Sequence, residues 1–152
     1  YKPGGLIQYQ SFVPKENAVR THETLIRMAK AAGMPSYLGV FKKHVPDKDP
    51  YLIRHAVDGY SLAMDFRVTR HNRQRLWKLT HEMDRVVLDA GGRFYFAKDA
   101  TMRPATPERF LPDGNLQKFM ALKEKCDPDN LLQTDLSRRI FGEEFGHRHQ
   151  GE

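Results

Sequence analysis

Cysteine is almost absent from this chain of 152 residues, in which Cys126 is the only one. A single thiol excludes an internal disulfide framework and a zinc site built from several cysteines. Long apolar runs are missing too: none approaches the ~18 residues of a membrane-spanning helix, and no signal peptide is recognisable. We therefore expect a soluble protein, located in the cytoplasm.

The common catalytic and nucleotide-binding motifs are also missing. The chain contains no GxGxxG, no phosphate-binding loop and no GxSxG. Its seven histidines show no HExxH or comparable spacing. The sequence therefore predicts no metal site, and its motifs give no sign that the chain itself holds a dinucleotide.

The composition is that of an ordinary globular protein, with 39% hydrophobic and 29% charged residues. The net charge of +6 would suit a polyanionic partner such as a nucleic acid or an anionic membrane. The basic residues are spread from Arg20 to Arg148, however, so a solvated basic surface is the simpler interpretation. The chain opens on Tyr1-Lys2-Pro3-Gly4-Gly5, which is typical of a linker, and we expect it to be a piece of a longer protein.

Hydrophobic periodicity predicts two successive strand–helix–strand units. We expect strands over residues 6–13, 37–45, 60–68 and 94–97, and helices over residues 15–32 and 70–90. Gly33 and Gly91-Gly92 are placed to end the two helices, and Thr69 to cap the second. This order predicts an α+β fold, a ferredoxin-like plait (βαββαβ) with an antiparallel sheet and two helices on one face, over residues 1–98.

Residues 99–152 are expected to form a mainly helical tail. Thr106-Pro107 resembles a helix start, residues 116–125 are expected to be helical, residues 136–141 to form a short turn, and residues 147–152 to be a frayed end. About fifty residues with few strands cannot build a core of their own. We therefore expect the tail to pack on the plait or on a domain outside this chain.

The open face of such a sheet is where a ligand would bind, and alternation predicts its residues. In the third strand Ser61, Ala63 and Asp65 alternate with an apolar set that must meet the helices. In the first strand Gln8 and Gln10 share one face with Phe12. Two amides on one face suit the hydroxyls of a sugar-like ligand, while two solvated glutamines are the alternative interpretation.

Two further residues have ambiguous patterns. Lys98 follows the aromatic run 94–96, where it could anchor a flavin or an anionic substrate, or pair with Asp99 in solvent. His44 lies at a strand end, where it could be a general base, although a lone histidine there is more often neither base nor ligand.

An ordered series of segments carries a resemblance to a known family. These segments are 6–10, 40–46, 59–66, Gly91-Gly92-Arg93-Phe94-Tyr95-Phe96-Ala97-Lys98-Asp99, Lys125-Cys126-Asp127-Pro128 and Thr134-Asp135-Leu136-Ser137-Arg138-Arg139. The series resembles the C-terminal substrate domain of the FAD-linked oxidases of the vanillyl-alcohol-oxidase superfamily. It is nearest to the decaprenylphosphoryl-ribose oxidases and more distant from the aldonolactone oxidases.

The resemblance implies hydride transfer from a sugar, sugar-lactone or polyol hydroxyl to FAD, which an N-terminal domain outside this chain would bind. It implies that the chain alone is inactive, that its partners are that domain and the substrate, that no nucleic acid binds, and that peripheral membrane association is open. The site residues implied are Lys98 and Tyr95 as catalytic, Lys98 also as cofactor-binding, and Gln8, Gln10, Lys42, His44 and Ser61 as substrate-binding.

The chain also departs from these relatives. The lactone oxidases have His-Trp-Gly-Lys where this chain has Tyr95-Phe96-Ala97-Lys98, which argues against a plain lactone oxidase. Ala63 and Ser61 replace a cysteine and an asparagine of the ribose oxidases, so a different substrate is left open.

Two alternatives from other classes remain. Arg93-Phe94-Tyr95-Phe96-Ala97 faintly resembles an aromatic RNA-binding motif, but it lies on the fourth strand rather than the third. A regulatory or structural plait without catalysis is the other alternative.

Overall fold

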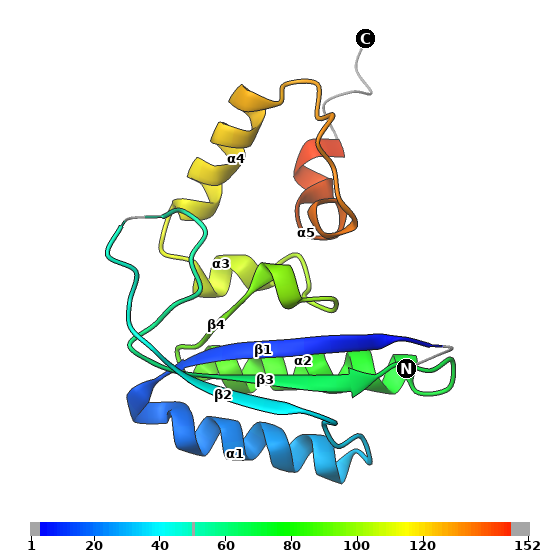
Figure 1. Ribbon diagram of the computed structural model, residues 1–152. Helices are drawn as coiled ribbons and strands as arrows, with labels where there is room; N and C mark the ends of the chain where they lie inside the picture. Colours follow the sequence, from blue (N-terminus) through cyan, green and yellow to red (C-terminus); the bar gives the residue numbers. More distant parts are fainter. Residues whose placement is uncertain (1–3, 50, 147–152) are drawn as a thin grey trace.

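An antiparallel sheet of four strands, in the order β2-β3-β1-β4, lies at the centre of the computed structural model, which describes residues 4–49 and 51–146. Helices α1 and α2 lie side by side on one face of the sheet (Figure 1). The ferredoxin-like plait with a helical tail is therefore confirmed. The elements are β1 (Leu6–Pro14), α1 (Lys15–Ala31), β2 (Gly39–His44), β3 (Gly59–Arg67), α2 (Arg73–Asp89), β4 (Arg93–Phe94), the 3-10 turn η1 (Phe96–Lys98), α3 (Thr106–Phe110), α4 (Asn115–Cys126) and α5 (Asp135–Gly146).

The central pair of strands sets the register of the sheet. β1 pairs with β3 over its whole length, from Leu6 opposite Arg67 to Pro14 opposite Gly59. Pro14 is thus the last residue of β1, one residue beyond the predicted end of the strand. Only glycine fits at position 59, because a Cβ there would lie 2.1 Å from the carbonyl oxygen of Val13.

The apolar core lies between the sheet and the two helices, as the alternation predicts. The Tyr9 hydroxyl of β1 donates a hydrogen bond of 3.1 Å to Asp84 of α2, which shows that this face of β1 meets the helices. Val19 and Ile26, which follow the helical spacing of α1, are instead exposed. The fully buried side chains of this core include Val13, Leu25, Met64, Phe66, Leu76, Met83 and Val87.

The ends of the helices follow the sequence signals closely but not fully. Gly33 and Gly91 take left-handed φ angles of 68° and 73° just after α1 and α2, as expected of glycines at these positions. The predicted start of α2 is wrong by three residues, because Thr69 and Asn72 exchange side-chain-to-backbone hydrogen bonds in a turn that precedes the helix. Thr106 is the first residue of α3 rather than its cap, which is Ala105.

Aromatic rings join the plait to the tail. Phe94 contacts Tyr9 in the plait and Phe110 in α3, with ring centroids 6.0 and 5.6 Å apart. Phe96 in turn contacts Phe110 and Phe141 of α5 at 5.7 and 6.4 Å. The tail and the plait therefore share one continuous set of apolar contacts, while the division at residue 98 stays a prediction.

The tail itself is more helical than the sequence predicts. α5 has 12 residues in place of the short turn expected over residues 136–141. The expected frayed end, residues 147–152, lies outside the described residues.

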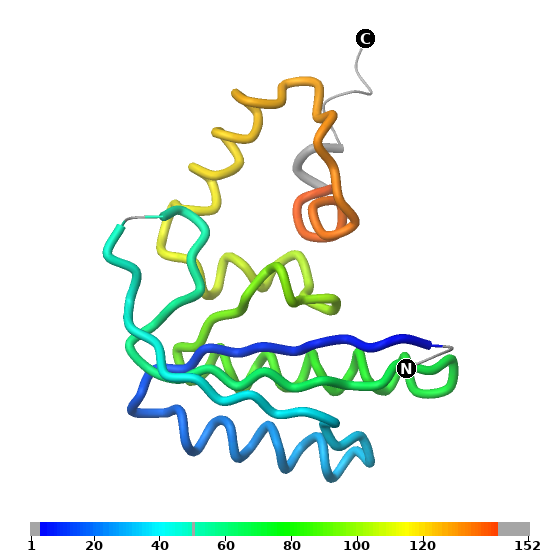
Figure 2. Tube along the Cα trace, in the orientation of Figure 1, coloured from blue at the N-terminus to red at the C-terminus, as the bar shows by residue number. Residues whose placement is uncertain are grey.

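The long connection between β2 and β3 reaches the tail. It leaves β2, arches past the β4 edge of the sheet and returns to β3 (Figure 2). At the far end of this arch Asn115 of α4 donates a hydrogen bond of 3.0 Å to the carbonyl oxygen of Leu52. The connection thus brings residues from outside the sheet, His55 among them, close to the helix-free face.

Candidate functional site

The helix-free face of the sheet carries a row of polar side chains from its three longest strands. Gln8 and Gln10 alternate with the core residues of β1, and Ser61 and Asp65 alternate with those of β3. In the register Gln8 lies opposite Asp65, and Lys42 of β2 lies opposite Ser61. The alternation in the sequence had placed both glutamines and Ser61 on this face.

Hydrogen bonds link these side chains across the strands. The amide Nε2 of Gln8 donates to Asp65 Oδ1 at 2.7 Å, and that of Gln10 donates to Ser61 Oγ at 3.3 Å. Ser61 Oγ also lies 2.8 Å from Nε2 of His44. Since Ser61 accepts from Gln10, its own proton is available for His44, so the three groups can form one directed chain.

This face is helix-free but not solvated. Ser61 is 0% and Gln10 is 8% exposed, so the interpretation of two solvated glutamines fails for Gln10. The carbonyl oxygen Oε1 of Gln10 is buried and has no hydrogen-bond partner among the described residues. A buried unpaired acceptor costs about 1–3 kcal/mol, a penalty that a hydroxyl donor from a ligand would remove.

A run of four rings borders the polar cluster. His44 lies against Phe12 at 4.8 Å between ring centroids, Phe12 against His55 at 4.7 Å, and His55 against Tyr95 at 4.5 Å. Burial lowers the pKa of both histidines. The charge of Lys42 lowers the pKa of His44 further. For His55, the Asp47 carboxylate raises the pKa and the charge of His44 lowers it, and burial remains the largest effect. Both imidazoles are therefore held toward the neutral form, in which a ring nitrogen can accept a proton.

Lys98 lies apart from the hydrogen-bonded cluster. It is the last residue of the turn η1. The predicted strand over residues 94–97 is wrong in its length, since β4 stops at Phe94 and η1 follows. The suggested pairing with Asp99 is wrong: Asp99 accepts from the Arg139 guanidinium at 3.1 Å and from the backbone of Met102 at 2.9 Å. Among the described residues the Lys98 ammonium forms no hydrogen bond or ion pair.

Of the seven predicted site residues, the structure thus groups five by hydrogen bonds or strand register. The hydrogen bonds join Gln10, Ser61 and His44, the register adds Gln8 and Lys42, and the His55 ring connects this group to Tyr95.

Sequence reasoning missed His55 and gave no role to Asp65 or Phe12. Alternation had put Asp65 and Phe12 on this face, so their position was available from the pattern. His55 lies in the irregular connection before β3, where no periodicity exists to place it. Only the tertiary structure brings its ring between Phe12 and Tyr95.

Two kinds of feature are absent from the described residues. No cluster of three or more His, Cys, Asp or Glu side chains within residues 4–49 and 51–146 is arranged to hold a metal ion. In the same part of the chain, no helix combines the length and the apolar character that crossing a membrane requires.

Comparison with known proteins finds a relative that matches most of this chain. The chain is 31% identical to decaprenylphosphoryl-beta-D-ribose oxidase of Mycolicibacterium smegmatis over 140 residues. This match covers 92% of the chain. The chain is related to an oxidase. It spans only 29% of that oxidase, so the activity of the whole relative comes to this chain only as a proposal.

A second relative adds similarity without a function. An uncharacterized protein from the mprA 5′ region of Streptomyces coelicolor is 34% identical over 82 residues, which are 54% of this chain and 20% of that protein. No family model matches the chain. The comparisons therefore support an oxidoreductase relationship.

Proposed function

We propose that the chain is the substrate-binding part of an FAD-dependent oxidoreductase that oxidises a sugar, sugar-lactone or polyol hydroxyl by hydride transfer to flavin. An FAD-binding domain outside this chain would hold the cofactor. The observation that carries the proposal is the buried, hydrogen-bonded group Gln10–Ser61–His44 on the helix-free face, in a chain related to an oxidase.

The amides supply the recognition of a polyhydroxyl ligand. A carboxamide has both donors and acceptors, as a sugar hydroxyl does, so the two groups can pair in either direction. The unpaired Oε1 of Gln10 would accept from one hydroxyl, while Gln8, fixed by Asp65, would meet a second. Lys42, exposed opposite Ser61, would border the same ligand.

The imidazole of His44 supplies a place for the hydroxyl proton. Oxidation of a carbinol removes a hydride from carbon and a proton from oxygen. With its pKa lowered by burial and by Lys42, His44 is neutral near pH 7 and can accept that proton, directly or through the Ser61 hydroxyl. A general base within hydrogen-bond reach typically contributes about 10²–10⁴ in rate.

The residues around η1 suit a bound flavin and the negative charge that develops in the reaction. A bound flavin would supply the acceptor of the hydride. The half-buried Lys98 ammonium, unpaired among the described residues, would hold negative charge on the cofactor or on the substrate oxygen. Tyr95, packed on His55, would line the same side.

The RNA-binding alternative gains no support from this face. An RNA-binding plait stacks bases on exposed aromatic rings of its open face. Here the ring of Phe12 is 1% exposed and flanked by two histidines, so it offers no surface to a base.

The function is tested by flavin reduction in the FAD-loaded protein, mixed in a stopped-flow instrument with a panel of sugars, sugar lactones and polyols. At least one class should bleach the flavin, and Lys98→Met should slow that step by about 10²–10³, as loss of one charge-stabilising group typically does. The control is Lys30→Met in the last turn of α1, which removes the same charge far from the helix-free face. No reduction by any of the three classes contradicts the proposal, and an unchanged rate removes Lys98 from the site.

The location of the cofactor has its own test. The purified 152-residue chain should be colourless after mixing with FAD and gel filtration, because it lacks any dinucleotide-binding motif. Stoichiometric flavin absorbance in the chain alone would show that the cofactor site lies here and not in another domain.

A further inference from the structure

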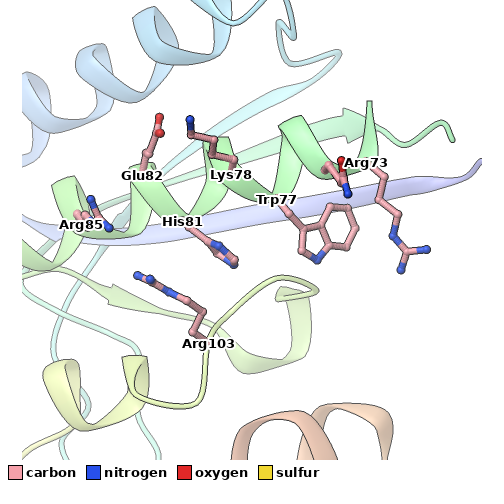
Figure 3. A pocket seen from close by; sticks show the side chains of 8 residues that line it. Arg73, Trp77, Lys78, His81, Glu82, Arg85 and Arg103 are labelled. Carbon is pink, nitrogen blue, oxygen red and sulfur yellow. The ribbon is translucent and has the colours of Figure 1, made fainter. Parts of the chain in front are cut away.

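A groove runs along the outer side of α2, on the other side of the sheet from the polar cluster. Its volume is about 610 Å³. α2 contributes all of its lining except Arg103, which comes from the loop before α3 (Figure 3). The residues of α2 in this α2 groove are Arg73, Gln74, Trp77, Lys78, His81, Glu82 and Arg85.

The charges of the α2 groove are unbalanced. It has four permanently cationic side chains and one carboxylate, Glu82. Within residues 4–49 and 51–146, neither Glu82 nor the groove's arginines and lysine form an ion pair. Figure 3 shows Arg103 reaching toward the side of α2 from which His81 projects, while Glu82 extends the other way. An anion beside Arg103, His81 and Arg85 would therefore not meet the carboxylate.

The loop that carries Arg103 is held in place from two directions. The Asp99 carboxylate accepts hydrogen bonds from the backbone of Thr101 and Met102. From α5, Arg139 donates to the carbonyl oxygens of Ala100 and Met102, at 3.0 and 3.2 Å. Arg103 therefore projects from a fixed backbone, which reduces the entropy lost when a ligand is bound.

The His81 ring is fixed by the same loop. Its Nε2 lies 2.8 Å from the Thr101 carbonyl oxygen, so Nε2 carries the proton and donates. The other ring nitrogen, Nδ1, has no hydrogen-bond partner among the described residues and is left for the groove. His81 thus ties α2 to the loop and holds Arg103 at a set distance from the helix.

A structural role accounts for only part of this charge. Arg103 lies close enough to the buried Asp84 to lower the pKa of its carboxyl, which burial raises to about 7. The guanidinium of Arg73 lies over the Trp77 ring, 5.1 Å from its centroid. Neither contact explains why Arg85 also lines the groove without a counter-ion.

We propose that the α2 groove binds a phosphate-bearing ligand, with the phosphate between Arg85, His81 and Arg103 and the rest of the ligand against Trp77. The planar forks of two guanidinium groups match the oxygens of a phosphate, which accept paired hydrogen bonds from them. The volume falls within the ~300–1,000 Å³ of small-molecule sites. A soluble phosphate ester and a phosphate lipid headgroup offer the same chemistry.

Trp77 is the only tryptophan among these 152 residues, so the emission of the 152-residue chain reports on this groove alone. One arm titrates the protein with phenyl phosphate, and with phenol as the matched ligand without phosphate. The other arm uses phosphatidylcholine vesicles with and without phosphatidic acid. Phenyl phosphate or phosphatidic acid should change the Trp77 emission in a saturable way, whereas phenol and plain vesicles should not. The arm that responds identifies the source of the phosphate.

Variants decide whether the site is specific. Arg103→Gln and Arg85→Gln should each weaken binding about tenfold or more, since each removes a charged hydrogen bond. The control Arg20→Gln removes the same charge from the exposed side of α1 and should change binding less than about twofold. Circular dichroism of each variant checks that the fold is kept. Arg103→Lys keeps the positive charge but removes the planar guanidinium, so it shows which of the two the ligand needs.

Two results would overturn the proposal. The first is no saturable change in Trp77 emission in either arm. The second is an equal loss of binding in Arg20→Gln and Arg103→Gln. That result would mean that the anion responds to the net charge of the protein and does not bind in this groove.

Discussion

The Nε2 atom of His44 lies 2.8 Å from the Oγ atom of Ser61, which joins the last residue of β2 to a fully buried residue of β3. Gln10 of β1 donates to the same oxygen. One hydroxyl therefore connects three strands on the face of the sheet that the helices leave free.

This hydroxyl should matter for stability as well as for any ligand. Ser61→Ala would leave the Gln10 amide and the His44 ring nitrogen unpaired in a buried place, so we expect a loss of about 1–3 kcal/mol in the free energy of unfolding. Urea denaturation monitored by circular dichroism measures it.

Ser11 is the matched control. It is also 0% exposed, one residue along β1 from Gln10, but its hydroxyl faces the helices and has no hydrogen-bond partner among the described residues. Ser11→Ala should therefore be neutral or stabilising. Equal losses in the two variants would show that the Ser61 hydrogen bonds contribute nothing specific.

The buried Asp84 should make stability depend on pH. Burial raises the pKa of its carboxyl to about 7, from 3.8 in an unfolded chain. Between these values the folded state holds a proton that the unfolded state has released, so this contribution is present at low pH and is lost as pH rises toward about 7. Its slope within the window approaches ~1.4 kcal/mol per pH unit.

Asp84→Asn removes this titration and keeps an oxygen that can accept from Tyr9. Relative to wild type, the variant should be more stable at pH 8 than at pH 5, as urea denaturation at both values would show. Asp89→Asn, on the same helix but exposed, should follow wild type at both pH values. A constant gap between wild type and Asp84→Asn would contradict the expectation.

Arg139 should stabilise the fold far more than its neighbour Arg138. Its guanidinium donates to the carbonyl oxygens of Asp99, Ala100 and Met102 and to the Asp99 carboxylate. Arg139→Met should lower the free energy of unfolding by about 1.5–3 kcal/mol or more, because hydrogen bonds from a charged group are lost. Arg139→Lys should not restore this stability, because an ammonium lacks the planar pair of donors of a guanidinium.

Arg138→Met removes the same kind of side chain one position earlier. Among the described residues Arg138 pairs only with the fully exposed end of Asp135 and with Gln133, so its loss should change stability by less than about 1 kcal/mol. Thermal unfolding of the two variants compares them, and equal midpoints would refute the role given to Arg139.

Alternation was enough to predict the fold and one face of the site. A period of two along residues 60–68 and 6–13 assigns each side chain to a face once the apolar set is known, so Gln8, Gln10 and Ser61 could be placed without coordinates. Helix ends followed from glycines that take left-handed angles. These are local properties, and they survive folding unchanged.

Long-range contacts account for what the sequence did not reveal. The aromatic run 94–96 has the composition of a strand, but Phe96 turns toward Phe110 and Phe141 and the ladder ends at Phe94. Asp99 pairs with a residue forty positions later rather than with the lysine beside it. His55 reaches the site through an arch without any repeating pattern. None of these contacts leaves a signal in local spacing.

The chain of rings from Tyr9 through Phe94, Phe110 and Phe96 to Phe141 has a consequence for how such a unit can be inherited. A recombination event that exchanged the plait alone would cut through these contacts and expose rings on both fragments. Exchange between genes is therefore expected to succeed only when the sheet and α3 to α5 travel as one cassette. Chimeras joined before residue 6 should yield soluble protein, whereas chimeras joined at residue 98 should aggregate.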